Sequence, residues 1–276
     1  MLTEERFKIV CEATRWNVRA ALDLISIHAE QDVRGLQPRA SLNPYIALAA
    51  FAAWERFLGD LGGAATVPDG KWDDKGLGKG NRGPGHERLT SGLAYHPKDL
   101  NGYLRNRGVL SGDFSDGWEA VLAASWAGVT PKRWRYAEYR QDPDVFHEAL
   151  DSAAAVRNGA AHMALPGNVT VVPTKAASVS VDSDELEAVT DGAPEPAFYW
   201  TNDAEAPTIQ NGHARLVTAL CVQLIDSSIA HVAKASDWGS QRYRLPDSWF
   251  AAKVPAREPR YAGVEFWGGQ ALHRVV

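Results

Sequence analysis

The chain has 276 residues, 45% of them hydrophobic and 23% charged, and no apolar run is long enough to span a membrane. Its formal net charge of −5 argues, taken alone, against a nucleic-acid partner. Residues 176–208, however, hold eight Asp or Glu and no Lys or Arg, so removing that segment from the count leaves the rest of the chain at +3. The charge therefore does not exclude a polyanionic substrate.

The compartment is predicted from the first residues and from the cysteines. The opening stretch "MLTEERFKIV" mixes charged and apolar residues and lacks the apolar core of a signal peptide. Cys11 and Cys221 each lie inside an apolar helical pattern, which indicates small buried side chains and no disulfide framework. We therefore expect a cytoplasmic protein without membrane association.

Two amphipathic helices are predicted first. The helix over residues 3–30, capped by Thr3, has one buried face whose members recur at three- and four-residue spacing: Phe7, Val10, Thr14, Val18, Ala21, Leu22 and Ile25. The helix over residues 41–63 has Pro44 in its first turn and ends at Gly62–Gly63. Its predicted inner face comprises Ile46, Ala49, Ala50, Ala53, Trp54 and Phe57.

The middle of the chain alternates between loop and helix. Residues 63–113 are rich in Gly and charge and predict a long surface loop, with a short helical piece near 97–107. Helices are predicted over 115–130 and 142–165, and Pro166–Gly167 end the second of these.

The last third predicts an insertion, a helix and a tail. "NVTVVP" and "SVSVD" have the β-branched content of strands and precede an acidic loop, so we predict a small β and acidic insertion over 163–208. A helical pattern resumes over 209–235, and the aromatic-rich extension 236–276 is expected to dock on the bundle. The fold class is therefore all-α: a helical bundle over 1–235, with the insertion within it, and a C-terminal extension.

The motif "RNGAAH", residues 157–162, interrupts the apolar helix 142–165 with polar side chains. Asn158 and His162 are four residues apart and share a helix face, and Arg157 is long enough to reach the same side. A guanidinium binds phosphate as a fork, and an imidazole moves protons near neutral pH. This combination is suited to cleavage of a phosphodiester without a metal.

The same residues also have a purely structural interpretation. Arg157 could pair with Glu148 or Asp151 at the helix surface, and His162 could be a cation favoured by the helix C-terminus. Spacing alone leaves this alternative open and favours it.

"RNGAAH" resembles the R-[N/D/H]-x-x-x-H signature of the HEPN superfamily, whose members are helical bundles with the motif on a late helix. "YIALAAFAAWERFLGDL", "ARLVTALCVQLIDSSI" and "RYRLPDSWF" are similar to segments of RiboL-PSP-type HEPN endoribonucleases, so the resemblance extends over residues 5–250. It implies a metal-independent endoribonuclease that acts as a dimer and needs no cofactor. His162 would transfer protons, and Arg157 would hold the scissile phosphate. Asn158 would orient His162 or the phosphate.

Two further stretches are candidate RNA contacts. "PKRWRYAEYR", residues 131–140, interleaves basic and aromatic side chains, as single-strand binding surfaces do, and offers Arg133 and Arg135. "GKGNRG", residues 78–83, formally matches G-x-G-x-x-G, but no strand precedes it, so Lys79 and Arg82 on a loop are better suited to phosphates than to a dinucleotide. The alternative for 131–140 is a loop that packs Trp134 and Tyr136 on the domain with its charges in water, and the alternative for 78–83 is plain disorder; the sequence favours these alternatives.

"HEALD", residues 147–151, lacks the second His of a zinc protease motif, and we expect no metal site. The sequence thus predicts an RNA-cleaving homodimer, as in a bacterial toxin or phage-defence effector, with an antitoxin or regulator as a further partner. The alternatives are a non-catalytic HEPN module that binds RNA or a partner, and an unrelated helical enzyme in which His162 is structural.

Overall fold

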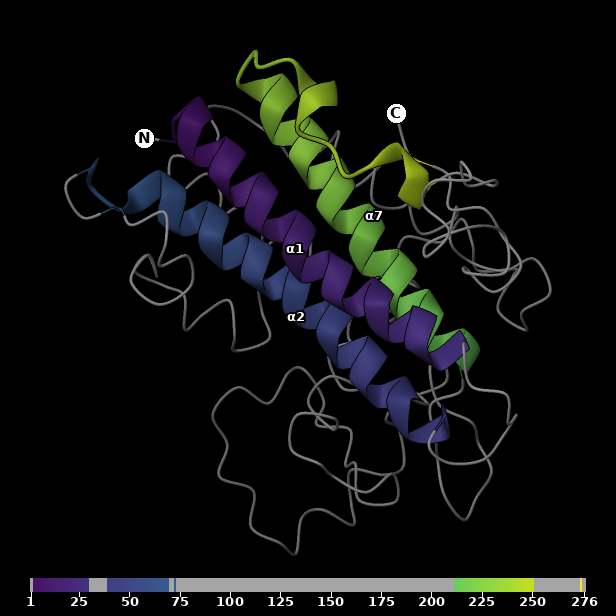
Figure 1. Cartoon of the computed structure of the whole chain (residues 1–276). Coiled ribbons are helices and arrows are strands. Elements are labelled where there is room, and N and C mark those ends of the chain that lie inside the picture. The colour runs from purple at the N-terminus through teal and green to yellow at the C-terminus, as the bar shows by residue number, and fades with distance from the viewer. Residues whose placement is uncertain (1, 30–38, 70–71, 73–210, 251–273, 275–276) are drawn as a thin grey trace, which may run out of the picture.

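The computed structural model describes residues 2–29, 39–69, 72, 211–250 and 274 (Figure 1). These residues form three long helices, α1 (Glu4–Ala29), α2 (Arg39–Thr66) and α7 (Asn211–Ala235), and two short 3-10 helices, η4 (Ser240–Arg242) and η5 (Asp247–Trp249). This part of the chain contains no strand, in agreement with the predicted all-α class. The predicted β and acidic insertion over 163–208 lies outside the described residues, as do the helices predicted over 97–107, 115–130 and 142–165.

The three long helices lie side by side with their axes roughly aligned (Figure 1). α2 and α7 run in the same direction, and α1 runs opposite to both. α2 packs extensively against both α1 and α7, whereas α1 and α7 touch over a smaller region. No helix in the described ranges combines the length and the hydropathy that a membrane span requires.

The predicted inner face of α1 is confirmed. All seven of its residues are buried, from Phe7 to Ile25. Thr3 caps the helix as expected, because its Oγ1 accepts a hydrogen bond from the backbone N–H of Arg6 at 3.3 Å.

The predicted end of α2 at Gly62–Gly63 is wrong. The helix continues to Thr66, because Leu61, Ala64 and Ala65 are buried and their packing outweighs the low helix propensity of the two glycines. The helix also begins earlier than predicted, at Arg39, so Pro44 lies inside it rather than in its first turn.

Arg6 of α1 secures the end of α2. Its guanidinium donates to the backbone carbonyl oxygens of Ala64, at 2.9 Å, and Val67, and it forms an ion pair with Asp69 at 2.7 Å. It also lies 4.8 Å from the centre of the Trp72 ring. A cation that binds the last carbonyls of a helix both satisfies those acceptors and complements the helix dipole. Arg6 thereby gives α2 the defined end that the glycines do not.

α7 is the most completely buried element. Every side chain from Val217 to Ile229 is buried, on all sides of the helix that the sequence predicted over 209–235. Two of its hydroxyls donate to carbonyl oxygens one turn earlier, Thr218 to Ala214 at 3.0 Å and Ser228 to Leu224 at 2.6 Å. Local bonds of this kind let polar residues lie inside a buried helix without losing a hydrogen bond.

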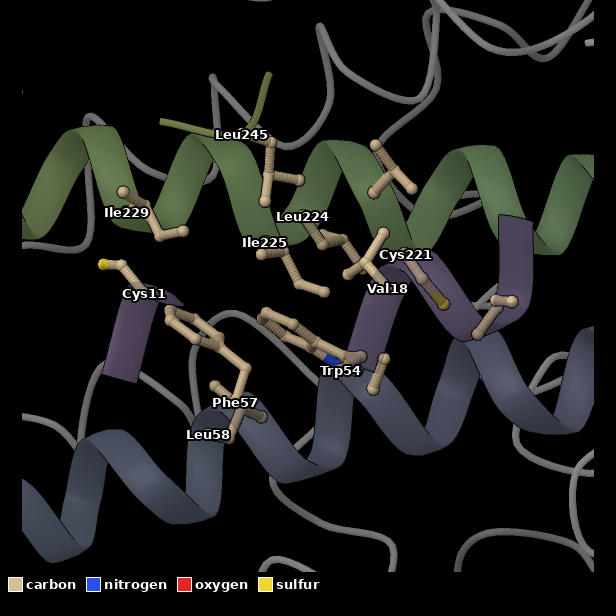
Figure 2. Close-up of a cluster of buried hydrophobic side chains, with 14 of the residues drawn as sticks. Cys11, Val18, Trp54, Phe57, Leu58, Cys221, Leu224, Ile225, Ile229 and Leu245 are labelled. Carbon is tan, nitrogen blue, oxygen red and sulfur yellow. The ribbon is translucent and has the colours of Figure 1, made fainter. Parts of the chain in front are cut away.

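α7 contributes to a core in which aromatic and aliphatic side chains from all three helices interlock (Figure 2). Trp54 and Phe57 of α2 are stacked with their ring centres 6.0 Å apart, and both lie beneath Ile225 of α7. Val18 of α1 belongs to the same core cluster. Aromatic pairs of this kind stabilise the fold by more than the burial of their apolar area alone would.

The chain reverses direction after α7 through a Schellman turn. The backbone N–H of Trp238 bonds the carbonyl of Ala233 at 2.8 Å, and that of Asp237 bonds the carbonyl of Lys234 at 3.2 Å. Asp237 has the left-handed conformation that this turn requires, with φ of 57°. The Trp238 ring then packs on Phe7 of α1 at 5.3 Å, so the turn also fixes where the following segment begins.

Replacing Asp237 with glycine should stabilise the protein. A glycine has no Cβ and therefore avoids the cost of the left-handed conformation, so we expect Asp237→Gly to raise the free energy of unfolding by about 1 kcal/mol in urea denaturation. Asp237→Ala is the matched control, since it removes the carboxylate but keeps the Cβ. A glycine variant no more stable than the alanine variant would contradict this account of the turn.

Candidate functional site

All seven site residues predicted from the sequence lie outside the described residues: Lys79, Arg82, Arg133, Arg135, Arg157, Asn158 and His162. Their roles therefore stay predictions, and the described part of the chain carries a different set of polar groups. These groups gather where α7 meets the segment that follows it and where that segment meets α1.

The centre of the polar groups is the carboxylate of Asp226 on α7, which has no exposure to water. Its Oδ2 accepts two hydrogen bonds from Arg244, from Nε at 2.9 Å and from Nη2 at 2.6 Å. Its Oδ1 accepts the backbone N–H of Leu245 at 2.9 Å. The Arg244 side chain is itself only 5% exposed, so the two groups form a buried ion pair in which both Arg244 donors converge on one carboxylate oxygen.

A second guanidinium, that of Arg274, reaches the same carboxylate from 48 residues along the chain. Its Nε donates to Asp226 Oδ2 at 3.1 Å, Nη1 donates to the carboxylate of Asp247, and Nη2 donates to the carbonyl oxygen of Leu245. The guanidinium also lies 4.4 Å from the centre of the Phe250 ring. Arg274 is thus held by groups from both α7 and the 245–250 segment.

The segment after α7 is also tied to α1. Arg15 Nη2 donates to the carbonyl oxygens of Arg242, at 3.1 Å, and Arg244, at 2.8 Å. The hydroxyl of Tyr243 donates to Glu4 Oε1 at 2.6 Å, and the Arg242 guanidinium forms an ion pair with the same carboxylate. These contacts hold the backbone of Arg244 in the position from which its side chain reaches Asp226.

The cysteines are confirmed as buried free thiols and have no nucleophilic character. Burial raises the pKa of both the Cys11 and the Cys221 thiol far above the usual range, so both are protonated at neutral pH. Because the thiolate is the reactive form, neither is suited to covalent catalysis.

His231 of α7 is the described histidine with an altered proton affinity. Partial burial, and secondarily the positive charge of Lys234, lower the pKa of its imidazole from 6.5 to about 4. The ring is therefore neutral at physiological pH and does not act there as a proton donor. Within the described ranges, no group of three or more His, Cys, Asp or Glu side chains is placed to hold a metal ion.

The sequence contains a signal for the Asp226 cluster that the spacing of apolar residues does not capture. An aspartate stands inside the apolar run "LCVQLIDSSIAHV" of the predicted helix 209–235, and a carboxylate buried in such a run requires a cationic or hydrogen-bonding partner. The nearest basic residues downstream that are not on α7 itself are in "RYRLPDSWF", where Arg244 lies. The sequence around Arg274 contains no comparable signal that this residue pairs with Asp226.

Comparisons with known proteins add no assignment, since no family model, no curated protein and no solved structure matches this chain.

Removal of the charge on Asp226 should be severely destabilising. Asp226→Asn leaves the guanidinium of Arg244 buried without its counter-charge, and we expect a loss of about 3–5 kcal/mol in the free energy of unfolding, measured in urea. Asp247→Asn is the matched control, because it makes the same change on a carboxylate that is 92% exposed and should shift the midpoint little. Equal effects of the two substitutions would show that Asp226 does not have the central role described here.

The imidazole of His231 should make stability depend on pH. Its folded-state pKa is lower than its unfolded-state pKa, so between pH 6.5 and about 4 the unfolded chain binds the proton first and stability falls as the pH falls. In His231→Gln that contribution is absent, and the plot of urea midpoint against pH should be flatter across this window. The two plots should run parallel above pH 7; parallel plots at all pH values would refute the lowered pKa.

Proposed function

We propose that the protein is a metal-independent endoribonuclease of the HEPN type, which acts as a homodimer in a bacterial toxin or phage-defence role. The observation that carries the proposal is the sequence "RNGAAH" at 157–162, which places an Arg, an Asn and a His at the spacing of the HEPN signature. The all-helical character of the described core is compatible with it, because HEPN-like folds are helical bundles.

The proposed reaction needs only the ribose and these side chains. The 2′-oxygen attacks the adjacent phosphorus, the bond from phosphorus to the 5′-oxygen breaks, and the products are a 2′,3′-cyclic phosphate and a 5′-hydroxyl. His162 takes the proton of the 2′-hydroxyl or delivers one to the leaving 5′-oxygen. Arg157 binds the phosphate and stabilises the charge that develops in the transition state, and Asn158 orients the imidazole or the phosphate.

A dimer follows from the number of proton carriers. One copy of the motif supplies one imidazole, whereas the reaction has one proton to remove and one to deliver. Two copies related by a two-fold axis would bring two His162 side chains to one composite site.

The rest of the RNA would be held by basic residues outside the motif. Arg133 and Arg135 stand among aromatic residues that can stack on bases, and Lys79 and Arg82 offer charge for the phosphate backbone. Both groups belong to the part of the chain that is positively charged once residues 176–208 are set aside, and such charge favours a polyanion.

The test is RNA cleavage in the presence of EDTA. The unaltered protein should cut structured RNA, and His162→Ala should reduce the rate by at least about 100-fold, the lower end of what a positioned proton-transfer group contributes. His147→Ala is the matched control, because it removes an imidazole from the same predicted helix but outside the motif, and it should retain activity.

Three results would overturn the proposal. Cleavage that stops in EDTA would indicate a metal enzyme, and cleavage that persists in His162→Ala would remove the imidazole from the mechanism. Binding of RNA without cleavage by any variant would indicate a non-catalytic module. The same oligonucleotide with 2′-deoxyribose at the cut site should stay intact, since it lacks the attacking hydroxyl.

A further inference from the structure

The groups around Arg274 have the composition of a receptor for a guanidinium. Three acceptors surround it: Asp226 Oδ2, the Asp247 carboxylate and the Leu245 carbonyl oxygen. Together they accept from all three of its nitrogens, and the Phe250 ring lies 4.4 Å from the guanidinium carbon. Arginine fits such a site because its planar guanidinium offers a fork of donors and a face that stacks on an aromatic ring. Lysine has neither feature.

This receptor does not depend on Arg274 for its own integrity. Asp226 is already bonded twice by Arg244 and once by the backbone N–H of Leu245, so its charge stays balanced when Arg274 leaves. Asp247 is 92% exposed, so water solvates its carboxylate when the guanidinium departs. Losing Arg274 therefore leaves Asp226 paired with Arg244, and no buried charge is left without a counter-charge.

The emptied receptor would attract a cation. Without Arg274 its charged members are Asp226, Asp247 and Arg244, which together carry one net negative charge. The Arg274 side chain is 18% exposed where it is bound, so the site borders solvent.

From these contacts we infer that Asp226, Leu245, Asp247 and Phe250 form an arginine-binding site that Arg274 occupies within the chain and that an arginine of a partner peptide can occupy in its place. Arg274 lies 24 residues beyond Phe250 in the chain and competes as an intramolecular ligand. A ligand on the same chain competes with a free one, so a partner arginine binds when it replaces the Arg274 guanidinium at these acceptors.

The probe is the labelled hexapeptide ALHRVV, the sequence of residues 271–276, followed by fluorescence anisotropy against the full-length chain. Full-length Arg274→Ala, whose site is empty, should bind the peptide about tenfold more tightly than the unaltered protein, whose site is filled. The peptide with Lys in place of Arg should bind Arg274→Ala at least about tenfold more weakly than the original, because a lysine ammonium cannot bridge the three acceptors.

A double variant locates the binding. Asp247→Asn in the Arg274→Ala background should weaken binding of the arginine peptide several-fold. The far-UV circular dichroism spectrum should stay unchanged, because Asp247 is exposed and does not support the core.

Either of two results would overturn the inference. The first is that Arg274→Ala binds the arginine and lysine peptides alike, or no better than the unaltered protein does. The second is that Arg274→Ala fails to fold while Arg274→Lys folds, since Arg274 would then be a fixed part of the core and not an exchangeable occupant. Neither outcome bears on RNA cleavage, so the arginine site and the proposed nuclease stand or fall separately.

Discussion

One fully buried carboxylate determines how the described part of the chain is organised. Asp226 lies on the helix that is buried over most of its length, and its counter-charges come from Arg244, in the segment after the Schellman turn, and from Arg274. The pair with Arg244 therefore requires that turn, and it requires Arg15 and Glu4 of α1 to hold the returning backbone in position. Packing of the apolar faces brings the helices together, and the ion pair specifies the single path the chain takes around them.

Two different kinds of chemistry are thus proposed for two different parts of the chain. The RNA-cleaving motif belongs to residues 157–162, whereas the arginine-binding groups belong to α7 and the residues just after it. The described thiols and the neutral imidazole of His231 offer no competing nucleophile or acid at neutral pH. The proposed reaction would depend on side chains at 157–162, which belong to a different part of the chain.

The sequence predicted most of what periodicity can reveal. All seven inner residues of α1 are buried, and the α2 face around Trp54 and Phe57 lies in the core, because a three- and four-residue spacing of apolar side chains admits few other arrangements. The predicted end of α2 is wrong because glycine is only a local signal. The observed end is held by Arg6, nearly sixty residues away in the chain. The Asp226 cluster was missed for the same reason, since its partners are 18 and 48 residues distant. The motif at 157–162 stays a prediction, because it lies outside the described residues.

The order of the helices along the chain has a consequence for biosynthesis. α1 and α2 are neighbours in sequence and can pair as soon as both leave the ribosome, but α7 begins 145 residues after α2 ends. Until then α7 cannot cover the surface of α2 on which it packs, which includes Trp54. A nascent chain with a wide apolar surface is a natural client for chaperones that bind such surfaces, and pairing of such distant segments is slow. Translation arrested before residue 211 would yield a product that lacks the third helix of this core.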